Sequence, residues 1–136
     1  MDYTKTLEEL ENDYWEEPIF DSNLVRKCHL LRKKALKDFS AEDLRILINQ
    51  QFSLKYLIPL AINELEKNIL AEGDYYPGDL LLAVLRVDAK YWNDHEMEWV
   101  KVKQLVNSES EIIKISDNCE STTKDIMNAF GKFIKR

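Results

Sequence analysis

Glycine and proline are scarce in this 136-residue sequence, which contains three of each. Gly-rich phosphate-binding loops need several closely spaced glycines, so that class of nucleotide site is excluded. Sandwiches and doubly wound sheets also use many turn residues, whereas the abundance of Leu, Ile, Glu and Lys favours helices. The length suits one domain with one core. We therefore predict an all-α fold, a single-domain bundle of about seven helices that spans residues 1–136.

Histidine and cysteine are scarce as well, with two of each. Cys28 and Cys119 lack the close spacing of metal ligands. His95 starts a pattern similar to that of zinc proteases, but Trp99 stands where the second histidine ligand would be. On a helix, His29 would point away from the neighbouring Cys28, which is wrong for a thiolate–base pair. We therefore expect no enzyme activity, with no catalytic residue, no cofactor and no metal.

The N-terminal residues have neither the basic start nor the apolar run of a signal peptide. Two distant cysteines do not form a disulfide framework, so reduced thiols are expected. These two features together predict a cytoplasmic location.

The net charge of −6 arises from blocks of opposite sign. Residues 1–21 contain eight acidic side chains and one basic one, and residues 22–37 contain six basic side chains and no acidic one. An acidic chain is a poor candidate for non-specific nucleic-acid binding and a better one for binding a basic protein. We therefore predict a protein partner and no nucleic-acid partner.

The basic block 22–37 is typical of an amphipathic helix, which Asp21 or Ser22 would cap. Its predicted apolar stripe consists of Leu24, Val25, Cys28, Leu31, Ala35 and Leu36. The first cysteine is therefore expected in the core. Helices of this kind can lie on an anionic membrane, so a membrane-surface protein is one alternative function. The acidic segment directly before the block can neutralise it within the fold, so we expect no stable membrane association.

Two further amphipathic helices are predicted from apolar residues that recur at spacings of three and four between Leu44 and Leu65. A capping box of Ser40 and Asp43 would open the first helix, and Ser53 would cap the second. Pro59 removes one backbone donor within the second helix. We therefore expect a kink there or a late start near Ile58.

A turn over residues 72–79 holds two of the three glycines and one of the three prolines. The fixed φ of Pro77 suits the start of a helix, and Asp79 would lie near the positive helix N-terminus. Residues 78–87 are apolar on nearly every side, which predicts a short helix buried at the centre of the bundle.

The turn also carries a resemblance to a known family. Tyr76–Leu81 (YPGDLL), with Glu72–Asp74 (EGD) and matching positions elsewhere in residues 42–92, resembles the helical immunity proteins of bacterial contact-dependent growth inhibition (CDI) systems. The resemblance implies a monomer that binds one cognate toxin domain, often a nuclease, in a one-to-one complex. It implies no particular binding site, because members of the family bind different toxins. The residues alone leave a helical adaptor or regulator unrelated to toxins as the alternative.

Residues 99–115 allow two interpretations. We expect Asp94 to cap a helix that runs to about residue 106, with its inward side formed by Met97, Trp99, Val102 and Val106. Valine and lysine alternate at residues 100–103, and a polar turn follows at 107–110. This pattern would instead suit a β-hairpin. Mainly apolar residues that recur at helical spacing favour the helix. They are Ile112, Ile115, Cys119, Thr123, Ile126, Phe130 and Phe133.

Two acidic surfaces with aromatic residues are candidates for toxin binding. A nuclease binds a polyanion, so an inhibitor of its site would offer carboxylates and aromatic anchors. The first candidate surface consists of Glu72, Asp74, Tyr75, Asp88, Trp92 and Asp94. The second consists of Asp13, Trp15, Glu16 and Glu17. We favour the first, because short loops on a rigid core lose little entropy on binding, whereas a chain end frays.

Overall fold

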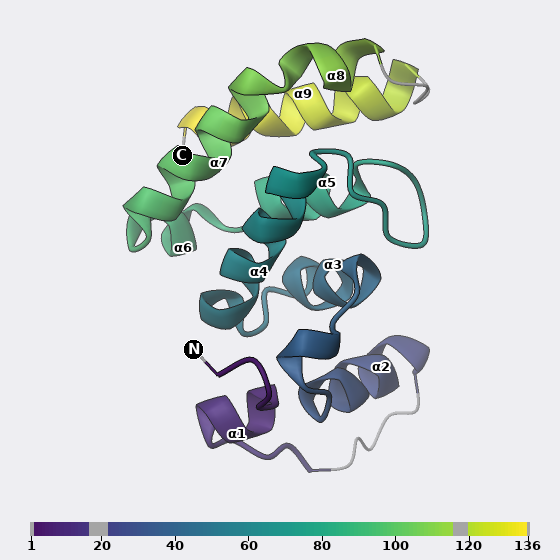
Figure 1. The fold of residues 1–136 in the computed structure, drawn as a ribbon, viewed down its shortest axis with the longest axis vertical. Coiled ribbons are helices and arrows are strands. Elements are labelled where there is room, and N and C mark those ends of the chain that lie inside the picture. Colours follow the sequence, from purple (N-terminus) through teal and green to yellow (C-terminus); the bar gives the residue numbers. More distant parts are fainter. Residues whose placement is uncertain (1, 17–21, 116–119, 136) are drawn as a thin grey trace.

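The computed structural model describes residues 2–16, 22–115 and 120–135, and over these residues it contains nine α-helices, one 3-10 helix and no β-strand. In chain order they are α1 (Leu7–Glu11), α2 (Asn23–Arg32), η1 (Leu36–Asp38), α3 (Ala41–Asn49), α4 (Leu54–Lys67), α5 (Asp79–Leu85), α6 (Ala89–Asn93), α7 (Glu96–Ser108), α8 (Ser110–Ile115) and α9 (Glu120–Lys135). The all-α prediction is confirmed. Helices α1 and α2 lie at one end of the molecule and α7, α8 and α9 at the other (Figure 1).

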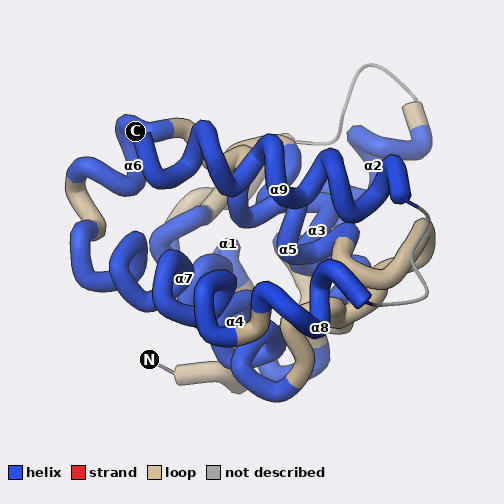
Figure 2. The backbone as a smooth tube through the Cα atoms, turned by 90° about the horizontal axis from the view of Figure 1, so that it is seen from above, coloured by secondary structure: helices blue, strands red, loops and turns tan. Residues whose placement is uncertain are grey.

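Helix α5 lies at the centre of the fold, as predicted. All seven of its residues are buried, and it packs against α3, α4 and α9. Seen from above, α5 lies between α9 and α4 (Figure 2). A helix that is apolar on every side gains hydrophobic free energy only when neighbours surround it, so the other helices are arranged around this one.

Polar side chains cap the first three α-helices. Thr6 and Glu9 form a capping box at α1. Ser22 accepts a hydrogen bond from the backbone N–H of Val25 and so caps α2. Ser40 forms the predicted capping box with the third residue of α3. Each cap satisfies backbone donors that the first helical turn leaves free.

Helix α4 begins at Leu54, directly after Ser53, and Pro59 lies inside it. Of the two alternatives, the late start near Ile58 is therefore wrong. Ser53 stands at the N-cap position but does not cap with its hydroxyl, which donates instead to Glu11 Oε1 (3.1 Å). Leu57, Ile58 and Ala61 are completely buried. Packing of this apolar face therefore outweighs the one backbone hydrogen bond that the proline removes.

The connection between α5 and α7 contains an unpredicted short helix, α6. Asp88 caps α6 by accepting from the N–H of Lys90, and Asp94 ends it. The prediction that Asp94 caps α7 is therefore wrong, since His95 stands at that position. Met97 was expected to face inward but is 87% exposed, because it comes two residues before buried Trp99 and so lies on the opposite side of the helix.

Residues 99–108 and 110–115 are helical, and the hairpin alternative is wrong for this segment. Trp99, Val102 and Val106 are buried as predicted. The predicted continuous stripe is broken, however, because α7, α8 and α9 are separate helices. Ile113 is buried in place of its neighbours Ile112 (48% exposed) and Ile115 (81% exposed). Cys119 lies outside the described residues.

Candidate partner-binding surface

The loop of residues 72–78 between α4 and α5, here called the Tyr75 loop, is held by a buried carboxylate. Asp79, the first residue of α5, is only 4% exposed. Its Oδ1 accepts a hydrogen bond from the backbone N–H of Gly73 (2.7 Å), and its Oδ2 accepts one from that of Tyr75 (3.2 Å). Gly78 precedes it with a φ of 94°, a value that favours glycine. The backbone of the loop is thereby closed onto the start of α5.

An ion pair on α3 holds the same loop from the other side. The guanidinium of Arg45 donates two hydrogen bonds to Glu42, from Nε to Oε1 (2.6 Å) and from Nη2 to Oε2 (2.7 Å). Glu42 Oε1 also accepts the backbone N–H of Asp74 (3.0 Å). The hydrogen bonds from Arg45, with a smaller contribution from the Asp74 N–H, hold the pKa of Glu42 below its ordinary value. This bidentate pair fixes the position of the Glu42 carboxylate.

The anchored loop presents two side chains to solvent. Tyr75 is 70% exposed, and the Cζ atom of Arg45 lies 4.5 Å from the centre of its ring, a cation–π contact. Asp74 is exposed, and its carboxylate forms no ion pair with any of the residues described. An aromatic ring and an unpaired carboxylate therefore project side by side from a rigid base.

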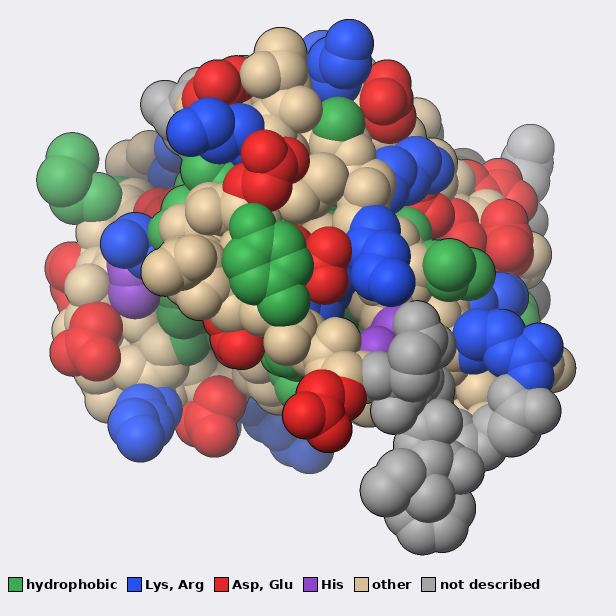
Figure 3. Space-filling view, turned by 90° about the horizontal axis from the view of Figure 1, so that it is seen from below, with side chains coloured by type: hydrophobic (Ala, Val, Ile, Leu, Met, Phe, Trp, Pro, Cys, Tyr) green, Lys and Arg blue, Asp and Glu red, His purple; other side chains and the backbone are tan. Residues whose placement is uncertain are grey.

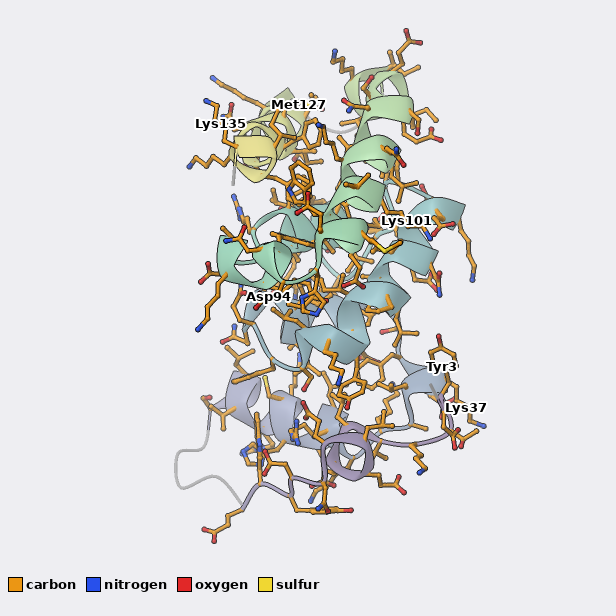
Figure 4. The ribbon with its side chains drawn as sticks, turned by 90° about the vertical axis from the view of Figure 1, so that its left-hand side faces the viewer. Tyr3, Lys37, Asp94, Lys101, Met127 and Lys135 are labelled. Carbon is orange, nitrogen blue, oxygen red and sulfur yellow. The ribbon has the colours of Figure 1, made fainter. Side chains whose placement is uncertain are left out.

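The structure does not bring the whole first candidate surface together. The Tyr75 loop lies on the right of the molecule in Figure 1, whereas Asp88 and Asp94 flank α6 on the left. Figure 4, which shows the left-hand side, places Asp94 at the turn between α6 and α7. Buried α5 separates the two groups, so the six residues cannot form one continuous contact area.

Trp92 is a correction to the predicted surface. It is 1% exposed and packs edge-on against Tyr91 (5.2 Å between ring centroids) and Phe133 (5.3 Å). The sequence shows an aromatic residue among polar neighbours, but α9 covers it from far along the chain. A side chain buried in this way cannot contact a partner, so we exclude it from the surface.

The second candidate surface is built around Trp15. The ring of Trp15 packs edge-on against the rings of His29 and Phe52, with distances of 5.2 Å and 5.1 Å between the ring centroids. Asp13 and Glu16 are exposed beside it. Glu17 lies outside the described residues. Three of the four predicted residues thus lie on one end of the molecule, next to α2.

Arg32 holds this N-terminal segment in place, a role that the sequence analysis missed. It is 2% exposed; its Nη1 binds Glu11 Oε1 (2.5 Å) and its Nη2 donates to the backbone carbonyl of Asp13 (2.7 Å). Its Cζ lies 4.4 Å from the centre of the Trp15 ring. The available signal was its position four residues after buried Cys28, which places it on the apolar side of α2.

The surface around α1 and α2 carries both charges. Seen from below, acidic and basic side chains alternate there with a few isolated hydrophobic ones (Figure 3). No helix in the described part of the chain is long and apolar enough to cross a membrane. The described residues also include no group of three or more His, Cys, Asp or Glu side chains that could hold a metal ion.

Comparison with known proteins gives one match. A family model described as CDI immunity proteins matches residues 9–102. No curated protein and no solved structure matches the chain. The matched stretch contains the Tyr75 loop and its anchors Glu42, Arg45 and Asp79. It also contains Trp15 of the second candidate surface, whereas helices α8 and α9 lie beyond it.

Proposed function

The chain belongs to the family of CDI immunity proteins, and from this premise we propose that it neutralises its toxin by covering the active or substrate-binding surface of the toxin domain. Membership in the family implies a cognate toxin as the protein partner. We further propose a one-to-one complex of the two proteins in the cytoplasm. The chain then acts by occlusion and carries out no chemistry of its own.

The observation that supports the binding surface best is the rigid presentation of Asp74 and Tyr75. Three hydrogen bonds fix the loop before a partner arrives: two to Asp79 and one to Glu42, whose carboxylate is held by Arg45. A preorganised loop loses little conformational entropy on binding. Exposed tyrosines on such loops are frequent centres of binding energy. We therefore assign the Tyr75 loop, with Glu72, to the interface.

The charge of this surface favours a toxin whose own substrate is a polyanion, such as a nuclease. Glu72 and Asp74 are both exposed and acidic. A basic substrate-binding site on the toxin would attract these carboxylates as it attracts phosphates. The proposal is tested by adding the chain to the purified toxin domain encoded beside it and measuring nucleic-acid cleavage. Cleavage that persists with the chain in excess would contradict it.

The interface is tested by charge reversal at matched positions. Asp74→Lys should weaken binding by about 2 kcal/mol, roughly a thirtyfold rise in Kd, if Asp74 lies in the centre of the interface. Asp94→Lys changes the charge equally but lies beside α6, so it should leave the Kd unchanged. Surface plasmon resonance at two salt concentrations measures the affinity and the association rate.

A different result would indicate that the toxin binds another surface. If Asp74→Lys binds as tightly as the wild type while its melting temperature is unchanged, the Tyr75 loop is not in contact with the toxin. Glu16→Lys is then the next variant, because Glu16 lies with Trp15 on the second candidate surface. Failure of the wild-type chain to bind the toxin at all would instead favour a helical adaptor with another partner.

A further inference from the structure

A hollow of about 320 Å³ opens between α2 and α3 at the foot of the Tyr75 loop. It brings together residues from three distant parts of the sequence. Those used below are Lys27, Leu30, Leu31, Lys34, Ile46 and Asp74. All of them lie within the stretch that matches the immunity family.

The inner wall of the hollow is apolar. Leu31 and Ile46 line it, each only 7% exposed and each part of the core. Leu30 stands at the rim and is 61% exposed, an unusually open position for a leucine that borders a concave site. Burial of such a side chain under a partner is favourable because it removes apolar surface from water. The hollow can therefore accept an apolar side chain.

The charges around the hollow leave one acidic group for a partner. Lys34 pairs with Asp43 (2.7 Å), and Glu42 pairs with Arg45 (2.6 Å). Asp74 also lines the hollow, and its carboxylate, like the ammonium of Lys27, has no ion pair among the described residues. A basic group next to the inserted apolar side chain would complement Asp74.

We infer that this hollow receives a large apolar side chain of the toxin, and that a neighbouring Lys or Arg of the toxin pairs with Asp74. The inference rests on the proposed function and adds to it the chemistry that selects the cognate toxin. An apolar anchor surrounded by charges is the usual composition of an interface centre. Toxins that lack either group at this position would be bound weakly, so the hollow acts as a specificity pocket.

Leu30→Gln tests the apolar half without changing the charge. Because Leu30 is largely exposed in the free protein, the variant should keep its fold and melting temperature. We expect the Kd for the toxin domain to rise about tenfold or more, mainly through faster dissociation. Met97→Gln is the matched control: Met97 is 87% exposed, lies on α7 away from the hollow, and should bind normally.

Asp74→Asn tests the charged half. It should slow association and reduce its dependence on salt, since the long-range attraction is lost while the size of the side chain is kept. Hydrogen exchange gives a third measurement that needs no variant. In the complex, amides of residues 27–34 and 42–46 should be protected, whereas those around Met97 should not.

Each outcome separates the inference from the proposed function. Tight toxin binding by the wild type with an unchanged Kd in Leu30→Gln, or no added protection at residues 27–34, would overturn the pocket and leave the immunity function intact. Equal losses in Leu30→Gln and Met97→Gln would also overturn it, because the effect would not be specific to the hollow. Absence of binding by the wild type would remove both proposals.

Discussion

The carboxylate of Asp79, buried at the start of α5, accepts a hydrogen bond of 2.7 Å from the backbone N–H of Gly73, six residues earlier. This bond joins the central helix of the core to the loop that carries Asp74 and Tyr75. Fold stability and the geometry of the candidate surface therefore depend on the same side chain. Variants in this region should change both.

Asp79→Ala should destabilise the protein by roughly 2–4 kcal/mol, because two backbone N–H groups lose a buried acceptor. Urea unfolding measures the change in the free energy of unfolding. Asp94→Ala removes an exposed carboxylate and serves as the control. A loss below about 0.5 kcal/mol in Asp79→Ala would show that water replaces the carboxylate without cost.

Gly73→Ala and Gly131→Ala should have opposite effects. A Cβ at Gly73 would lie 2.5 Å from Glu42 Oε1, and Glu42 cannot move without breaking its pair with Arg45. A Cβ at Gly131, inside α9, would meet nothing within 4 Å. We expect Gly73→Ala to lower the melting temperature and Gly131→Ala to raise stability by about 0.5–1 kcal/mol. Calorimetry on both variants measures whether each substitution stabilises or destabilises the protein.

Replacing Pro77 and Gly78 together by alanine should cost on the order of 1–3 kcal/mol. Gly78 caps α5 at a φ of 94°, where an alanine is strained, and Pro77 restricts the turn before it. The melting temperature should fall. If it stays the same and only toxin binding is lost, the turn serves recognition and not folding.

The lowered pKa of Glu42 predicts a contribution to stability that depends on pH. The folded state holds this carboxylate ionised more strongly than the unfolded state does. Its contribution is therefore complete above the ordinary glutamate pKa of about 4.3 and is lost as the pH falls through the lower folded pKa. Glu42→Gln should be less stable than the wild type near neutral pH, and the difference should shrink as the pH falls below the ordinary glutamate pKa. Urea unfolding across this range measures it, and a constant difference would contradict the assignment.

Local sequence signals predicted the helices well where the apolar face was long. The caps at Ser22 and Ser40, the buried helix α5 and the helical state of residues 99–115 followed from side-chain type and spacing. Short α6 was not predicted, because a helix of five residues is stable only through tertiary packing. Asp94 ends this helix, so its assignment as the cap of α7 was wrong. The assignment of Met97 as a core residue was wrong because Met97 lies on the side of α7 opposite buried Trp99.

The candidate surface was predicted in part. Glu72, Asp74 and Tyr75 lie on an anchored, exposed loop, whereas Trp92 is buried and Asp88 and Asp94 lie on the other side of the molecule. Proximity along the chain suggested that residues 72–94 share a surface. A buried helix between them is enough to separate their side chains.

By itself, the sequence determined the helical fold, most of the faces that turn inward and the resemblance to immunity proteins, since these depend on residues within one or two helical turns of each other. Only the tertiary structure decided which charged groups are used internally and which remain for a partner. Glu42, Asp79 and Arg32 are held by groups from other segments, and Asp74 faces solvent beside the hollow between α2 and α3. Such pairings join residues far apart in the sequence, 32 positions in the Asp74–Glu42 bond, and no periodicity in the sequence encodes them.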